Sequence, residues 1–468
     1  MRKRFDGYIC ISLYKELAVF LFVMRMNKDI SIRIENFGPI KGPETIYLRP
    51  FMIFSGVSGI GKSYLAMLVH FVYRILCGNE TRNFLFEKKI NFDWLKINFP
   101  DEESVICKIQ VSDFINWINE RALFYMRDMT GNQLFNAKIE ISLPDLPEYF
   151  TFLYGRNTVR SNGRNEIELV EVLKLVEDDG ALQFPQSSVG SWGEVPFMIL
   201  LNRFLQKKYE LRLDKTFFMP PSRGSLVAVP YELSFVMNQS KDMYQEFLSD
   251  LSSLKTLKPK SDFSESMDSA NKMLNKEVLH GGIDLKENEL IYKIEGSEDV
   301  IPITAVASSI KEISPFALMI QKGLLGSFSI LFEEPESHLH PELQLKVVDL
   351  LAYSLKEGAH LQITTHSDYI LRHINDLIRL HILRGKMADD VKFKSYCFEV
   401  GLDPHIVIDP DLVNAYYLSL DSNGDSYIKK QDVSMGIPFD TFNKVMDEQI
   451  VRSAELYDKV EFYIESES

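Results

Sequence analysis

The first residues that point to chemistry form a glycine-rich loop near the N-terminus. The segment FMIFSGVSGIGKSYLAMLVHF runs from Phe51 to Phe71 and contains the pattern G-x-x-x-x-G-K-[ST]. The pattern follows a predicted strand and opens a predicted helix, which is the context of a phosphate-binding loop. Glycines let the backbone turn its N–H groups toward phosphate oxygens, and the helix N-terminus adds partial positive charge. The residues expected to hold a nucleotide are Gly56, Val57, Ser58, Gly59, Ile60, Gly61, Lys62 and Ser63.

Two side chains of this loop are expected to contact the ligand directly. Lys62 is placed to reach the β- and γ-phosphates of ATP, and the Ser63 hydroxyl to ligate Mg²⁺. The alternative is a glycine-rich turn with a chance GKS sequence, and the strand–helix context disfavours it.

A pair of glutamates follows a second apolar run, in SILFEEPESHLHP. The run predicts a buried strand that ends at the pair. Glu333 is expected to hold the Mg²⁺ through water, and Glu334 to orient or polarise the attacking water. The alternative is an acidic strand end in solvent, which the phosphate-binding loop makes less plausible. Because Lys62 and Glu333 are far apart in the sequence, the sequence predicts one nucleotide-binding head split by a large insertion.

The next predicted strand, in LQITTHSDYIL, ends at His366. A histidine at that strand end can contact the γ-phosphate as a switch, whereas a lone histidine is more often structural.

Alternating strands and helices must position these residues. ISIRIEN and ETIYLRPFMIFSG predict strands, and SYLAMLVHFVYRIL a buried helix. In the second half, SFSILFEE and AHLQITTHS predict strands on either side of a helix in PELQLKVVDLLAYSL. This alternation predicts an α/β fold with a parallel or mixed sheet covered by helices.

The expected domain organisation divides the chain into six parts. They are an N-terminal extension (1–25), the N-terminal half of the head with the phosphate-binding loop (26–80), an inserted lobe (81–237), a helical arm (238–280), the C-terminal half of the head (281–385) and a small α/β tail (386–468). In the lobe the sequence leaves the elements of residues 80–190 unplaced, and then predicts a helix in WGEVPFMILLNRFLQKKYELRL and a strand in KTFFMPPSRGS.

The segment from Asp421 to Asp432, DSNGDSYIKKQD, imitates a calcium-binding loop. An EF-hand needs glycine at position six and glutamate at position twelve, where this chain has Ser426 and Asp432. Asn423-Gly424 between two strand-like runs instead predicts a hairpin turn.

Composition and charge limit the classes of protein to which the chain can belong. The chain has 468 residues, 46% hydrophobic and 25% charged, which is typical of a soluble globular protein with two or three cores. A net charge of -14 argues against a broad DNA-binding surface.

The four scattered cysteines favour a reducing cytoplasm over a disulfide framework or zinc site. The apolar run from Leu17 to Met24 is too short to span a bilayer, and no small-residue cleavage site follows it, which disfavours a signal peptide. Met26 is the expected natural start, with residues 1–25 an upstream extension or an extra helix.

Together these motifs resemble the ATP-binding-cassette (ABC) ATPases of the SMC, RecF and OLD type. IRIENFGPIKG is similar to their opening strand, FEEPESHLHP to their Walker B and D-loop, and TTHSDYIL to their switch-histidine strand. The similarity is strongest over residues 28–75 and 280–375. The resemblance implies a P-loop ABC-ATPase head that dimerises head to head around two ATP molecules, with a D-loop from Ser337 to His340.

A head of this type also presents a signature motif to the γ-phosphate of its partner. VASSIKEIS, with Ser308 and Ser309 before a helix, is the match. Ile310 replaces the family's glycine, which bears on the contact across the dimer and on the hydrolysis rate. A compatible alternative is a helix cap, with Ser309 as N-cap and Glu312 completing a capping box. Arg223 in FMPPSRGS resembles a P-x-x-R element of these proteins.

OLD-type proteins often add a Toprim nuclease, which needs a glutamate well separated from a D-x-D pair. The chain has Asp409-Pro-Asp411, but the nearest glutamate, Glu399, lies close upstream. An intrinsic nuclease is therefore not expected.

The resemblance extends to ATPase subunits of bacterial anti-phage systems, PARIS first and Septu second. It implies a cytoplasmic ATPase that forms a homodimer or larger homo-oligomer through its heads and uses ATP and Mg²⁺. Such a subunit senses DNA or a phage protein and controls a partner nuclease. No association with a membrane is expected. The alternatives are a RecF- or SMC-like DNA-repair or DNA-binding ATPase, and a nucleotide-gated scaffold with little turnover.

Overall fold

The computed structural model of the chain describes residues 29–78, 80–91, 104–160, 167–185, 192–229, 242–387, 389–438 and 440–466. The expected N-terminal extension, residues 1–25, lies outside the described residues.

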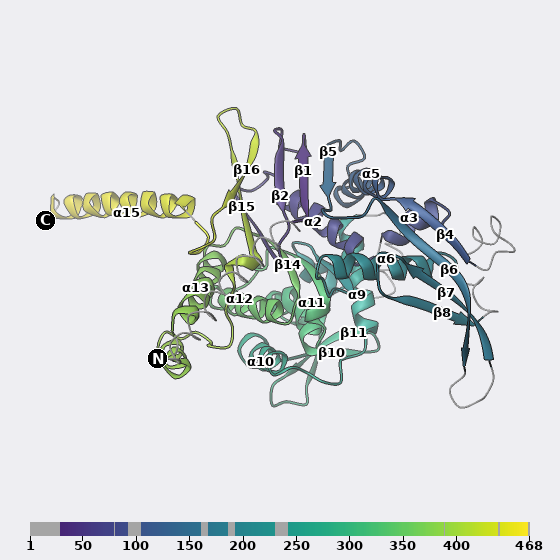
Figure 1. The fold of residues 1–468 in the computed structure, drawn as a ribbon. Coiled ribbons are helices and arrows are strands. Elements are labelled where there is room, and N and C mark those ends of the chain that lie inside the picture. Colours follow the sequence, from purple (N-terminus) through teal and green to yellow (C-terminus); the bar gives the residue numbers. More distant parts are fainter. Residues whose placement is uncertain are drawn as a thin grey trace, which may run out of the picture.

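A six-stranded sheet in the order β16-β15-β3-β14-β13-β9 forms the centre of the molecule (Figure 1). Its neighbouring strands are parallel except for the antiparallel hairpin of β15 and β16. Strands β3 and β13 are buried along their whole length, as apolar runs are when helices cover both faces of a parallel sheet. In chain order the strands are β3 (Phe51–Gly56), β9 (Lys215–Met219), β13 (Phe328–Glu333), β14 (His360–Thr365), β15 (Val413–Leu420) and β16 (Ser426–Gln431).

Helices cover this sheet. α2 (Lys62–Leu76) packs across β3, β14, β13 and β9, and α12 (Pro341–Lys356) packs on β14 and on α13 (Asp368–Lys386). α2 buries twelve of its residues, which explains why its sequence is apolar nearly all round. The α/β fold class with a mixed sheet, expected from the sequence, is confirmed.

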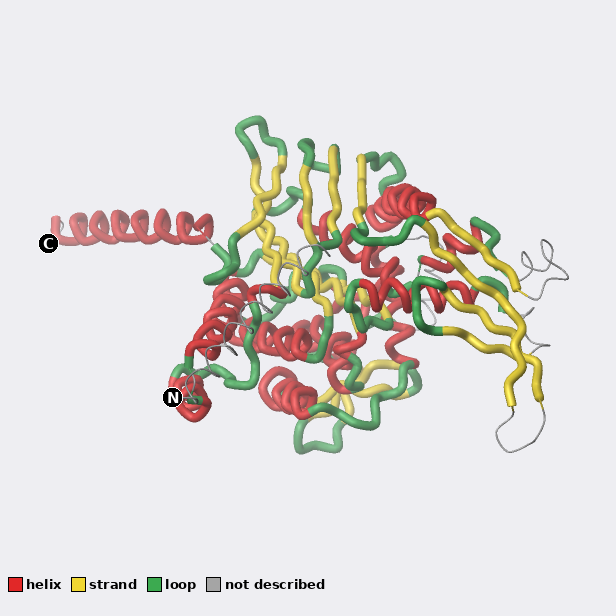
Figure 2. Tube along the Cα trace, viewed as in Figure 1, coloured by secondary structure: helices red, strands yellow, loops and turns green. Residues whose placement is uncertain are grey.

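Two further sheets lie beside the core (Figure 2). The first has the order β2-β1-β5, and the second, antiparallel, the order β4-β6-β7-β8. The second sheet and the helices around it account for most of the described elements in residues 80–190, the region whose elements the sequence did not place. The helix and strand predicted after that region are present as α6 and β9. The bounds are β1 (Ser31–Glu35), β2 (Glu44–Tyr47), α3 (Thr81–Glu87), β4 (Ser104–Gln110), α5 (Val111–Thr130), β5 (Lys138–Ser142), β6 (Tyr149–Arg160), β7 (Ile167–Leu175), β8 (Ala181–Pro185) and α6 (Val195–Lys208).

The described part of the expected helical arm lies against the body. α9 (Met243–Thr256) packs on β9 and α5, and α10 (Glu265–Met273) packs on α12 and on α11 (Ser308–Gln321). Asp242 and Ser264 cap these two helices by accepting hydrogen bonds from backbone N–H groups, as N-cap residues do. A π-helical turn (Leu274–Leu279) leads into a small sheet of β10 (Gly281–Lys286), β11 (Glu289–Ile294) and β12 (Val300–Pro302).

Part of the expected tail belongs to the central sheet. β15 pairs in parallel with β3, the strand that carries the phosphate-binding loop. β15 and β16 form the hairpin predicted around Asn423-Gly424, so the calcium-loop imitation is a turn. α14 (Asp390–Glu399) precedes them, and α15 (Asp440–Ser466) extends away from the body (Figure 1).

The pairing of β15 with β3 explains the glycine at position 56. Gly56 has φ +128°, and a Cβ atom there would lie 2.2 Å from the Leu418 carbonyl oxygen. Only glycine adopts this backbone conformation readily and leaves room for the approaching strand.

We therefore expect Gly56→Ala to lower the free energy of unfolding by about 2 kcal/mol or more. Gly42→Ala is the matched control, because nothing lies within 4 Å of its added Cβ, and its effect should stay within about 0.5 kcal/mol. Thermal and urea denaturation measure both. Equal stability of the two variants would contradict this account of Gly56.

Candidate functional site

Parallel pairing brings the separated motifs to one edge of the sheet. β14 lies between β3 and β13 and pairs with both in parallel. Gly56, Thr365 and Glu333 end these three strands, so the phosphate-binding loop, the switch histidine and the glutamate pair follow neighbouring strands. The carboxyl edge of a parallel sheet is where α/β proteins place their ligands.

The glycine-rich loop has the backbone of a phosphate cradle. Gly59 and Gly61 have φ values of +78° and +103°, and Gly61 is the N-cap of α2 without a side-chain cap. Val57, Ser58 and Gly59 are exposed, whereas Ile60 is buried and anchors the loop to the core. The N–H groups of the first turn of α2 are therefore available to an anion.

Lys62 is folded into this loop. Its Nζ donates hydrogen bonds to the carbonyl oxygens of Gly56 (3.1 Å) and Val57 (2.6 Å). Burial lowers the pKa of Lys62 to about 8, and Glu334, Glu336 and Glu333 oppose this decrease. The ammonium is thus the positive charge that faces three carboxyl groups, and phosphate oxygens beside it would favour its charged form.

Glu333 is the deepest acid of the site. Its side chain is buried, its Oε1 atom has no hydrogen-bond partner, and burial raises its pKa to about 7. A hydrogen bond with the Ser63 side chain and the charge of Arg223 oppose this rise. This influence on the pKa indicates that Ser63 and Glu333, the two residues expected to hold Mg²⁺, lie near each other although they come from distant parts of the sequence.

Glu334 occupies an unusual backbone position. Its φ of +44° lies in the left-handed region, which costs about 1–2 kcal/mol for a residue with a side chain. Its N–H donates to the Thr364 carbonyl oxygen (3.0 Å), and the Ser337 hydroxyl donates to its Oε2 (3.1 Å). Neighbouring residues therefore hold both the backbone and the carboxylate, an arrangement typical of a functional site.

His366 is joined to the acidic segment by a glutamate that the sequence analysis missed. The His366 N–H donates to Glu336 Oε1 (2.7 Å), and the Thr365 hydroxyl donates to the same atom (2.9 Å). The imidazole is exposed, and partial burial together with Lys62 lowers its pKa, which favours the neutral ring. The available signal for Glu336 was its position two residues after the glutamate pair.

Ser308 and Ser309 lie in the first turn of α11, where Ser308 is exposed. The capping-box alternative is wrong: Ala307 is the N-cap, no side chain caps the helix, and Glu312 is buried beside Arg223. The buried guanidinium has drawn Glu312 inward, away from the helix N-terminus.

Arg223 connects the elements around the glutamate pair. It begins the short helix α7 (Arg223–Val227) and has a completely buried side chain. Its guanidinium donates to the carbonyl oxygens of Glu312 (2.9 Å), Pro220 (3.0 Å), Glu333 (2.8 Å) and Glu334 (3.4 Å), and it stacks on the Phe332 ring at 4.5 Å. The guanidinium of Arg223 therefore holds the backbone of α11 and the end of β13 together.

The acids of the tail have structural contacts instead. Asp409 caps the 3₁₀ turn Pro410–Leu412 by accepting the Asp411 N–H (2.9 Å), and it lies 3.9 Å from His381. Glu399 ends α14 and is exposed.

Comparison with known proteins identifies the class. Residues 201–371 match the family model described as "AAA ATPase domain". This span includes Arg223, Ser308, Glu333, Glu334 and His366, while the phosphate-binding loop lies before it. No curated protein matches the chain.

Three solved structures are similar to the chain. They are an SMC head bound to the C-winged helix domain of ScpA (12% identity, 86% of this chain and 97% of that chain, TM-score 0.35), the SMC head domain from Thermotoga maritima (11%, 87% and 100%, 0.30), and an Smc head domain with an extended coiled coil bound to the C-terminal domain of ScpA, derived from Pyrococcus furiosus (11%, 89% and 98%, 0.30). These identities and TM-scores are low, so the ATPase assignment rests on the match over residues 201–371.

The chain is therefore an ATPase, as expected from its sequence, and the part similar to the AAA ATPase domain model is residues 201–371. Within the described residues, no helix is both long and apolar enough to cross a membrane.

The contacts of Arg223 generate a prediction. Arg223→Lys keeps a positive charge but loses the planar fork that reaches four carbonyl oxygens, so we expect a loss of about 3 kcal/mol in unfolding free energy and a strong decrease in ATP hydrolysis. The matched control is Arg82→Lys, because Arg82 pairs with Glu194 at the surface, and it should cost below about 1 kcal/mol. Denaturant titration and phosphate release measure the two effects. A fully stable and active Arg223→Lys protein would refute the proposed link.

Proposed function

We propose that the chain binds ATP at the loop from Gly56 to Ser63 and hydrolyses it with Glu334 as the residue that orients or polarises the attacking water. The observation that carries this proposal is the parallel pairing of β14 with both β3 and β13, which places the glycine-rich loop and the glutamate pair at one edge of the sheet. The two motifs lie far apart in the sequence, and nucleotide hydrolysis needs both of them side by side.

The chain's own residues account for binding and positioning. Backbone N–H groups of the loop and the N-terminus of α2 bind phosphate oxygens, and Lys62 exchanges its carbonyl partners for the β- and γ-phosphates. Ser337 orients the Glu334 carboxylate. Neutral His366, fixed through its backbone by Glu336, contacts the γ-phosphate through a ring nitrogen.

The residues present fit Mg²⁺. Ser63 and Glu333 offer hard oxygen ligands, and Glu333 Oε1 is a buried acceptor without a partner. When bound, the ion neutralises charge that develops on the phosphates during transfer.

We further propose that the head works as a homodimer or larger homo-oligomer. Ser308 is exposed at the start of α11, whose backbone Arg223 ties to the glutamate pair. A phosphate of a second copy's nucleotide at this position would act on α11 and, through Arg223, on the residues that activate water.

The biological role proposed here is that of a cytoplasmic sensor or regulatory subunit in anti-phage defence, which controls a partner nuclease in response to DNA or a phage protein. Its support is the sequence resemblance together with the structural contacts made by Asp409. A RecF- or SMC-like DNA-binding ATPase is the second candidate, and a nucleotide-gated scaffold is the third, favoured by Ile310 in the signature position.

Glu334→Gln should retain ATP binding and lose most hydrolysis, because the carboxylate acts on water while the loop holds the nucleotide. Lys62→Ala is the comparison variant and should lose binding, since it removes the loop's ammonium group. Calorimetric titration with a non-hydrolysable ATP analogue, phosphate release and size-exclusion chromatography with ATP measure these effects. Wild-type hydrolysis by Glu334→Gln would assign the catalytic acid elsewhere, and unchanged affinity in Lys62→Ala would refute the loop assignment.

The purified chain alone should not cut DNA with Mg²⁺ and ATP if a partner supplies the nuclease. Plasmid nicking, repeated with Asp409→Ala and Glu334→Gln, is the measurement. Cleavage lost specifically in Asp409→Ala would reveal a nuclease centre in the tail. Tight DNA binding that weakens with salt would favour the DNA-binding alternative.

A further inference from the structure

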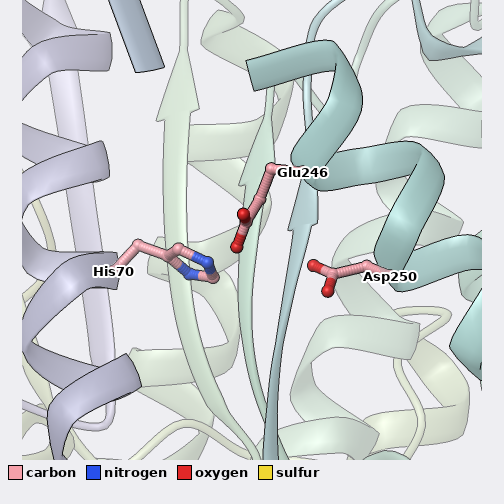
Figure 3. A group of neighbouring side chains, drawn as sticks. All are labelled: His70, Glu246 and Asp250. Carbon is pink, nitrogen blue, oxygen red and sulfur yellow. The ribbon is translucent and has the colours of Figure 1, made fainter. Parts of the chain in front are cut away.

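Three titratable side chains meet between the helix of the phosphate-binding loop and the inserted helix α9. His70 lies on α2, and Glu246 and Asp250 lie one turn apart on α9, so both carboxylates face the imidazole (Figure 3). One ligand atom from each lies within 4.8 Å of the others. None of the three belongs to the nucleotide site described above.

The burial of the His70 imidazole in the core is not explained by hydrogen bonds. His70 is 0% exposed, and neither ring nitrogen has a hydrogen-bond partner. The nearby Gln362 amide donates one N–H to the Ser329 hydroxyl (3.1 Å), and its second N–H can serve only one of the two ring nitrogens of His70. Buried polar groups in folded proteins are nearly always paired, so an unpaired imidazole directed at two carboxylates points to a missing ligand.

We propose that His70, Glu246 and Asp250 bind one divalent transition-metal ion, Zn²⁺ in the first instance, which clamps α2 to α9. Imidazole nitrogen and carboxylate oxygen are both zinc ligands, with a fourth position left for water or another ligand. A tetrahedral ion about 2.0–2.2 Å from each donor needs donors about 3.4 Å apart, which small side-chain rotations bring within reach.

The surroundings of the two carboxylates support this site. The Phe218 N–H donates to Asp250 Oδ2 (2.8 Å), which orients that carboxylate as a second hydrogen bond orients many metal ligands. Asp250 also lines a cavity of about 230 Å³ between α9 and β9. In the absence of an ion, burial raises the pKa of Asp250 to about 7 and lowers that of His70 to about 3.

Arg74 is the group that competes with a metal. Its guanidinium pairs with Glu80 (2.8 Å) and with Glu246 Oε1. A carboxylate has two oxygens, so Glu246 can keep Arg74 on one and bind an ion with the other. An arginine network without metal is the competing explanation, but it leaves both nitrogens of His70 unpaired.

Metal analysis of the full-length protein tests the proposal. The protein is loaded with Zn²⁺ or Co²⁺ without ATP or Mg²⁺, freed of loose metal, and measured by mass spectrometry for metal content and by Co²⁺ absorption for coordination. We expect close to one ion per chain and a chelator-sensitive rise in the melting temperature. Lys62→Ala should retain the ion, which separates this site from the nucleotide site.

Glu246→Gln and Asp250→Asn preserve side-chain shape and should each weaken binding by about tenfold or more. The matched control is Asp349→Asn, which disrupts the other buried histidine–carboxylate pair, His373 to Asp349 at 2.7 Å, and should leave metal content unchanged. Undiminished metal in both site variants would overturn the assignment. If those variants do not fold, the wild-type titration decides alone: no uptake and no change in melting temperature with either ion would mean that Arg74 completes the cluster.

Discussion

The parallel alignment of β3, β14 and β13 is the constraint on which the rest of the site depends. It forces three strands to end at one edge, where the glycine loop, His366 and the glutamate pair follow them. This edge holds three acidic residues close together, Glu333, Glu334 and Glu336. Two cations offset their negative charge from opposite sides. Lys62 faces the carboxylates from the loop, while Arg223 binds the backbone carbonyl oxygens behind them.

Sequence patterns predicted those parts of the site whose residues are adjacent in the sequence. The loop from Gly56 to Ser63 needs a strand, glycines and a helix start, and all are adjacent in sequence. Arg223 and Glu336 acquire their contacts only through folding: Arg223 reaches Glu333, and Glu336 reaches His366. A single sequence holds weak signals for such pairs, so the role of Arg223 was open and Glu336 was missed.

The same difference explains the limits of the fold prediction. Apolar runs such as SILFE identified buried strands, because a strand covered on both faces must be apolar. The sheet β4-β6-β7-β8 is antiparallel and partly exposed, so its residues carry a weaker pattern. The capping box at Ser309 failed because a buried guanidinium competed for Glu312. The strand Val413–Leu420 was expected in a separate tail, and nothing local specifies that it pairs with β3.

The position of β15 beside the phosphate-binding loop has a consequence for biosynthesis. Tyr47 and Tyr416 share a hydrogen bond although 369 residues separate them, and Gly56 packs directly against Leu418. A ribosome adds about 5–20 residues per second, so the loop waits roughly twenty seconds or longer for the strand that completes its support. During most of this interval both edges of β3 are unpaired, because β14 is also translated late, and unpaired strand edges favour chaperone binding. The nascent chain is thus expected to acquire nucleotide only after β15 has been translated, which delays ATP-dependent assembly until the central sheet has formed.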